Sequence, residues 1–206
     1  LAIFIAVFGV TKAQALAVVF GMMLVTALIS TLSGLWGVLV MDLFQFALKM
    51  GMVIVLAVCA VRAVGGMEAL KEKLHALDVA RAAGGGGGSI LSFTPDVGSV
   101  WMGAEPGGGG YVAQRIFSAR DEKHSLLATL WFNVAHYAVR PWPWVLTALA
   151  SLVLYPDLAD KESGFVKTIV DPAVFPVALR GVMIAAFAAA YMSSVGTQLN
   201  WGASYL

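Results

Sequence analysis

Charged residues are scarce in this chain: Asp, Glu, Lys and Arg make up 12% of its 206 residues, about half the share of a typical soluble domain. The net charge is only +1, which argues against a nucleic-acid partner, because such a partner requires a basic surface. One cysteine, Cys59, cannot form a disulfide within the chain, and no Cys/His spacing suits a metal. No Ser/His/Asp spacing or nucleophile elbow is present, so we predict that the protein is not an enzyme.

Hydrophobic residues, by contrast, make up 60% of the chain, and the mean hydropathy is +0.85. Several apolar segments approach or exceed the roughly 18 residues that mark a membrane-spanning helix. We therefore expect one all-α domain, a polytopic membrane helix bundle, with spans at about residues 1–10, 15–32, 35–64, 126–155 and 174–206. Because the chain starts and ends within apolar segments, we interpret it as a fragment of a longer multi-pass protein of the cell membrane, in a bacterium the inner membrane.

Two segments between the spans are expected to lie outside the bilayer. Residues 67–82 carry Leu70, Leu74 and Leu77 with charges between them, a pattern typical of an amphipathic surface helix. Residues 84–110 contain two glycine runs. Neither run is followed by the Lys-Ser/Thr pair that a phosphate-binding loop requires, so we interpret this segment as a flexible linker.

Three stretches combine small and polar residues in unusual patterns: residues 31–46 (TLSGLWGVLVMDLFQF), residues 111–125 (YVAQRIFSARDEKHS) and residues 179–200 (LRGVMIAAFAAAYMSSVGTQLN). Together they resemble the sodium:solute symporter family. Residues 31–46 resemble that family's Gly-Gly-Leu corner and Thr-Asp-x-x-Gln helix, with Ser33 and Met41 in place of the usual Gly and Thr. Residues 111–125 resemble the Gln-Arg loop after the sixth core helix. Residues 179–200, the most specific of the three stretches, resemble the eighth core helix.

The resemblance implies part of a ten-helix inverted-repeat core of the LeuT type, in which substrate and sodium bind near the bilayer midplane. The chain would supply the end of core helix three and then helices four, five, seven and eight, and the remaining transporter helices would be its partners. The sixth core helix, expected between Thr94 and Gly103, is missing. Without it, residues 64 and 111–125 would lie on one side of the membrane, whereas the family places them on opposite sides. A chain that truly lacks this helix is not expected to transport alone.

Paired hydroxyls, Ser193 and Ser194, occupy the last apolar segment. Lipid offers polar groups no partner, and sodium, a hard cation, prefers oxygen ligands. By the resemblance, Ala190 would provide its backbone carbonyl and both serines their hydroxyls to a sodium ion. The alternative is that the serines hydrogen-bond to carbonyls one turn earlier in their own helix.

A polar face also interrupts residues 126–155, where Asn133, His136 and Arg140 are spaced i, i+3, i+7. The resemblance implies that this helix lines the substrate cavity, and Arg140 could then donate two hydrogen bonds to a substrate carboxylate. Alternatively, Arg140 snorkels to water beside Trp142. Pro141 and its neighbour Pro143 should kink or break the helix here.

Asp42, Gln45 and Lys49 share one face of residues 35–64, and Asp42 and Lys49 could form an ion pair. By the resemblance, Asp42 matches an acid linked to sodium-dependent transport. We therefore assign Asp42 and Gln45 to ion coupling. Alternatively, Asp42 simply lies close to the inner surface of the membrane, where a charged carboxylate costs little free energy.

These features predict sodium-coupled symport of a small polar solute by alternating access across the lipid bilayer, with sodium as the coupling ion and no organic cofactor. The alternative is a non-transporting membrane scaffold or sensor on the same fold. The substrate itself is not indicated, because relatives carry sugars, amino acids, vitamins and carboxylates.

Overall fold

The computed structural model describes residues 2–84, 89–90 and 116–203, and within them the chain is a helical bundle without a strand. The described elements are α1 (Ala2–Phe8), α2 (Lys12–Val64), α3 (Met67–Ala83), α5 (Glu122–Asn133), the π-helical stretch η2 (Val134–Val139), α6 (Pro141–Leu154), the short 3-10 turn η3 (Lys161–Ser163), α7 (Gly164–Val170) and α8 (Val177–Ala203). Helices α2 and α8 are long and apolar enough to cross a membrane. The all-α membrane helix bundle predicted from the sequence is confirmed.

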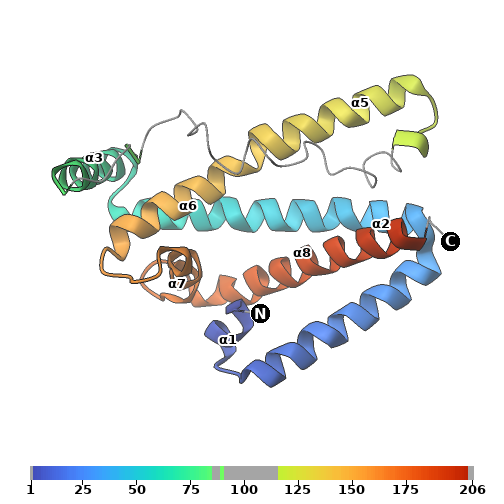
Figure 1. Cartoon of the computed structure of the whole chain (residues 1–206), viewed down its shortest axis with the longest axis horizontal. Coiled ribbons are helices and arrows are strands. Elements are labelled where there is room, and N and C mark those ends of the chain that lie inside the picture. Colours follow the sequence, from blue (N-terminus) through green and yellow to red (C-terminus); the bar gives the residue numbers. More distant parts are fainter. Residues whose placement is uncertain (1, 85–88, 91–115, 204–206) are drawn as a thin grey trace.

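Helix α2 is bent at Gly34 into two limbs, which we call the first limb (residues 12–33) and the second limb (residues 35–64) (Figure 1). Gly34 has φ 60° and ψ −164°, a backbone conformation that is essentially restricted to glycine. The first limb begins at a capping box formed by Thr11 and Gln14, and the second ends at Gly65, whose φ is 111°. The bend therefore has a local cause in the sequence.

Helix α8 packs against α2, and its C-terminal part lies close to the bend (Figure 1). Small residues make close packing possible there: a Cβ placed on Gly196 would lie 3.4 Å from the Thr26 side chain of the first limb. The second limb also contacts α8, through residues such as Asp42. The end of α8 is therefore flanked by both limbs of α2.

On its other side α2 packs against α6, which is the C-terminal part of a helical rod made of α5, η2 and α6. The rod starts at Asp121, whose carboxylate accepts a hydrogen bond from the His124 backbone N–H at 2.8 Å. That bond, with a second one to the His124 ring, lowers the pKa of Asp121 below its ordinary value. The α-helix of the rod is interrupted before the prolines, as predicted, although the chain stays helical. Pro141 occupies the first turn of α6, and the preceding backbone widens into a π-helix, in which the Arg140 N–H bonds to the Ala135 carbonyl at 3.0 Å.

Two apolar clusters hold the bundle together away from the bend. One joins the second limb to α7 and α8, and its buried members are Met52, Leu56, Ile169, Phe175, Met183 and Ala186. The other joins the end of the second limb to α3 and α6, and its buried members are Ala60, Val64, Leu70, Leu74 and Ala150. The surface helix α3 thus buries two of the three leucines noted in the sequence against the end of the bundle.

The ends of the bundle lie far apart. Helix α3 packs near the C-terminal end of α6, whereas α5 begins at the other end of the same rod, roughly 45 Å away at the rise of a helix (Figure 1). The end of α2 and the start of α5 therefore lie at opposite ends of the bundle, as the resemblance implied. Residues 91–115, which include the expected position of the missing core helix and most of the glycine-rich linker, lie outside the described residues. The exact span boundaries remain predictions.

Candidate functional site

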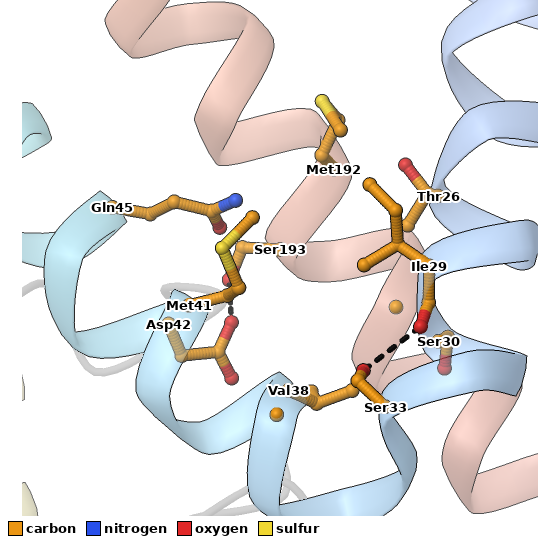
Figure 2. A pocket seen from close by; sticks show the side chains of 12 residues that line it. Thr26, Ile29, Ser30, Ser33, Val38, Met41, Asp42, Gln45, Met192 and Ser193 are labelled. Atoms are coloured by element: carbon orange, nitrogen blue, oxygen red, sulfur yellow. Dashed lines mark hydrogen bonds between the residues drawn. The ribbon is translucent and has the colours of Figure 1, made fainter.

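The central contact of the site joins Asp42 on the second limb to Ser193 on α8, 151 positions later. The Ser193 hydroxyl donates a hydrogen bond to Asp42 Oδ1 at 2.5 Å, and Thr197, one turn further along α8, reaches Asp42 Oδ2 at 3.5 Å. A hydroxyl–carboxylate distance of about 2.5–2.7 Å is typical of a charge-assisted bond. The structure therefore brings together two of the residues that the sequence marked out for ion binding and coupling (Figure 2).

Beside this contact lies a small cavity of about 30 Å³ between the two limbs and α8 (Figure 2). Its lining residues are Thr26, Ile29, Ser30 and Ser33 from the first limb, Gly37, Val38, Met41, Asp42 and Gln45 from the second, and Met192, Ser193 and Gly196 from α8. A volume of this size holds a water molecule or a bare ion, whereas small-molecule pockets measure about 300–1,000 Å³. The cavity is therefore of ionic rather than solute size.

Gln45 is the least satisfied polar group of the cavity. Its side chain is 9% exposed, and Oε1 has no hydrogen-bond partner among the described residues. Leaving a buried acceptor unpaired costs about 1–3 kcal/mol. Figure 2 shows the Gln45 amide directed toward Asp42 and Ser193. A cation in the cavity would provide the missing partner.

Hydroxyl oxygens of the first limb complete the lining. Thr26 donates to the Met22 carbonyl at 2.7 Å, and Ser33 donates to the Ile29 carbonyl at 2.8 Å. Each hydroxyl has thus committed its proton to its own helix but keeps lone pairs as an acceptor. These groups can face a cation without losing their helical hydrogen bond.

Ser194 differs from its neighbour. It is exposed, and its hydroxyl donates to the Ala190 carbonyl at 3.1 Å. This is the helix-internal bond that the sequence left open as the alternative to sodium binding. The sodium role of Ala190 and Ser194 remains a prediction, and of the three predicted ligands only Ser193 lines the cavity.

The second group of predicted residues, Asn133, His136 and Arg140, lies apart from the cavity on α5, η2 and the start of α6. Asn133 donates its side-chain N–H to the Thr129 carbonyl at 2.9 Å, so one of its donors is used within its own helix. Arg140 Nη1 lies 3.1 Å from His136 Nδ1, and the His136 ring stacks on Phe132 with centroids 5.1 Å apart. The structure therefore joins His136 to Arg140 but leaves Asn133 separate.

Sequence reasoning missed the contribution of the first limb and of Thr197. Thr197 follows Ser193 by one helical turn, so helical spacing could have placed it on the same face. No local signal could have placed Thr26 or Ser30 at the same cavity as Asp42, because that arrangement depends on the angle at Gly34.

Comparison with known proteins identifies the family to which the whole chain is similar. The family model described as "Sodium:solute symporter family" matches residues 2–206. The chain belongs to the sodium:solute symporter family. No curated protein and no solved structure matches it significantly. Membership in the symporter family indicates a membrane protein that couples solute transport to sodium, rather than an enzyme.

Proposed function

We propose that this symporter-family chain binds a coupling sodium ion in the cavity beside Asp42 and uses it to drive uptake of a small polar solute. The observation that carries the proposal is the coincidence of one carboxylate and an unpaired buried amide oxygen around an ion-sized cavity. A hard monovalent cation requires oxygen ligands, and a single carboxylate balances its charge.

The ligand set follows from the lining. Asp42 would provide the charge, and Gln45 Oε1 and the Ser193 hydroxyl would provide neutral oxygens. Ser193 now donates its proton to Asp42, and rotation of the hydroxyl would present its lone pairs to the ion instead. Ala190 and Ser194 stay as proposed ligands, but neither lines the cavity, so we expect each to contribute less to sodium affinity than Ser193 does.

The position of the cavity provides a physical basis for coupling sodium binding to solute transport. Its walls come from three segments, the two limbs of α2 and the end of α8. An ion that bridges them stabilises one relative arrangement of these helices. If the solute, bound near Asn133, His136 and Arg140, favours the same arrangement, ion and solute bind cooperatively. That cooperativity is the requirement for symport by alternating access.

The test is sodium binding by the 206-residue chain in lipid nanodiscs, followed by sodium-gradient-driven uptake in proteoliposomes that also contain the remaining helices of the transporter. We expect saturable binding of radioactive sodium that excess sodium displaces and excess potassium does not. Asp42→Asn should weaken it by about tenfold or more, because the ion loses its charged ligand. Sodium binding no stronger than potassium binding, or unchanged in Asp42→Asn, would contradict the proposal.

A further inference from the structure

The two halves of the α5–η2–α6 rod differ in how firmly they are attached to the bundle, and α6 is the fixed half. Its Trp144 ring stacks on Phe165 of α7 with centroids 4.8 Å apart. Tyr155, which directly follows α6, donates a hydrogen bond from its hydroxyl to Asp171 Oδ2 at 2.8 Å, just after α7. Helix α6 also packs against α2 and α3. These contacts come from several sides, so α6 has to keep its position relative to α2, α3 and α7.

Helix α5 has no such attachment. None of its 12 residues is buried, and among the described elements only η2 contacts it extensively. Its side-chain hydrogen bonds stay within the helix: Thr129 donates to the Ser125 carbonyl and Asn133 to the Thr129 carbonyl, each at 2.9 Å. Figure 1 shows α5 leading away from the region where α6 meets α2. Helix α5 is therefore held to the bundle mainly through η2.

The backbone that joins the two halves departs from regular α-helix. In η2 the Arg140 N–H bonds to the carbonyl of Ala135, five residues back, at 3.0 Å. Pro141 and Pro143 follow, and because proline has no N–H, neither can donate a hydrogen bond back across the junction to η2. Sharp helix kinks occur mostly at prolines and at π-helical turns, and this junction has both. The rod is therefore easiest to bend between α5 and α6.

One strip of side chains spans this junction. The His136 ring stacks on Phe132 with centroids 5.1 Å apart, and Arg140 Nη1 lies 3.1 Å from His136 Nδ1. An arginine N–H can only donate, so His136 Nδ1 is the acceptor. The three residues recur every fourth position, along one face of the rod from α5 to the start of α6. We call them the strap, because they favour one angle between the two halves.

We propose that η2 is a hinge about which α5 moves relative to the fixed α6, and that the strap stabilises the arrangement described above. Asn133 ends α5, whereas His136 and Arg140 lie within η2 and at its junction with α6. Motion at the hinge would therefore change the distance from Asn133 to the His136–Arg140 pair. This explains why the structure joins two of the three polar residues of the rod and leaves the third separate. The hinge is a property of this chain's backbone and does not depend on sodium binding.

The test measures distances between paired spin labels by pulsed electron paramagnetic resonance, on the chain in lipid nanodiscs with Cys59→Ser. Val58→Cys on the second limb is the reference, and its partner is Glu122→Cys or Leu130→Cys on α5, or Val145→Cys on α6; all four side chains are exposed. We expect the Val58–Glu122 distribution to be about twice as wide as the Val58–Val145 distribution, or wider. Leu130 lies about half as far from η2 as Glu122 does, so its excess width should be about half as large.

Substitutions at the junction should change the Val58–Glu122 width in opposite directions. Pro141→Ala restores an N–H that can bond back to η2, so the distribution should become narrower. His136→Leu removes the hydrogen bond of the strap, so the distribution should become wider. Pro156→Ala, in the loop after α6, and His75→Leu, on α3, are the same changes at exposed sites away from the junction and should have no effect.

Two results would overturn the hinge: equal widths for the labels on α5 and α6, or widths that neither Pro141→Ala nor His136→Leu changes. Broadening confined to Glu122, with Leu130 as narrow as Val145, would also overturn it, because it would show that only the start of α5 frays. The comparison among the labelled positions decides between these outcomes even if a variant does not fold.

Discussion

Adjacent serines on α8 have different surroundings because successive residues of a helix are rotated by about 100°. Ser193 reaches Asp42 on the second limb, whereas Ser194 is exposed and bonded to the Ala190 carbonyl of its own helix. The family resemblance implied that both hydroxyls bind sodium. Only their positions relative to the second limb distinguish Ser193, a candidate ligand, from Ser194, which forms a hydrogen bond within its own helix.

The two serines should therefore respond differently to mutation. We expect Ser193→Ala to weaken sodium binding by about tenfold, since a bond to a charged group is lost, and Ser194→Ala to change it by about threefold at most. Binding of radioactive sodium in nanodiscs measures both variants, and the comparison between them shows which hydroxyl contributes more. Equal losses would show that both hydroxyls bind the ion, as the family resemblance first implied.

A substitution at Gln45 can separate the effect of this side chain on folding stability from its effect on sodium binding. We expect Gln45→Leu to leave unfolding stability in choline chloride unchanged or raised by about 1–3 kcal/mol, because an unpaired buried oxygen is removed. Sodium binding should make the unsubstituted chain more stable in sodium chloride than in choline chloride, and this extra stabilisation should disappear in Gln45→Leu. Thermal melting followed by circular dichroism in the two salts measures this.

Gln198, an exposed residue of α8, provides the control for that experiment. Gln198→Leu should leave the difference between the two salts intact. A sodium-dependent melting shift that survives in Gln45→Leu would show that the amide oxygen is not a ligand.

At the scale of the elements, the bend of α2 positions the site. The first limb contributes Thr26, Ser30 and Ser33 to the cavity only because the helix changes direction at Gly34. The neighbouring rod behaves differently: its α-helix is interrupted before Pro141 and Pro143, as their positions predicted, but the chain stays helical through a π-helical stretch. Proline at a helix start loses no hydrogen bond, so its effect depends on where the new helical segment begins.

Substitution at the bend should test its importance. Gly34→Ala is expected to cost about 1–3 kcal/mol of unfolding stability, because a Cβ is strained at this φ and ψ, and to weaken sodium binding as the cavity distorts. Gly21→Ala, at a helical glycine of the same helix with open space around it, should be neutral or slightly stabilising. Chemical denaturation of both variants measures the difference in their unfolding free energies. Equal changes in Gly34→Ala and Gly21→Ala would mean that the backbone conformation of Gly34 does not determine the bend.

At the scale of the whole molecule, the bundle has two distinct ends. The end of α2, α3 and the end of α6 pack together through Leu70, Leu74 and Ala150, whereas α5 starts at the opposite end. In a membrane these ends should lie on opposite faces. Membership in the symporter family, together with the two long apolar helices, places the chain in a membrane.

Cysteine labelling checks that arrangement, because Cys59 is the single native cysteine and can be removed as Cys59→Ser. Glu68→Cys on α3 and Asp160→Cys after α6 should react with a membrane-impermeant maleimide from the same side. Glu122→Cys at the start of α5 should react only from the other side. Labelling of Glu68→Cys and Glu122→Cys from one side would contradict the described packing.

The sequence by itself determined that this chain is a bundle of membrane helices and pointed to Asp42, Ser193 and Arg140, because hydropathy, helical spacing and a family motif are properties of short segments. Only the tertiary structure decided which of these polar groups meet. Asp42 and Ser193 are 151 positions apart, and they come together because the bend at Gly34 and the small residue Gly196 let α8 pack close to both limbs. Contacts of that kind depend on the angle and distance between helices, which no single segment encodes.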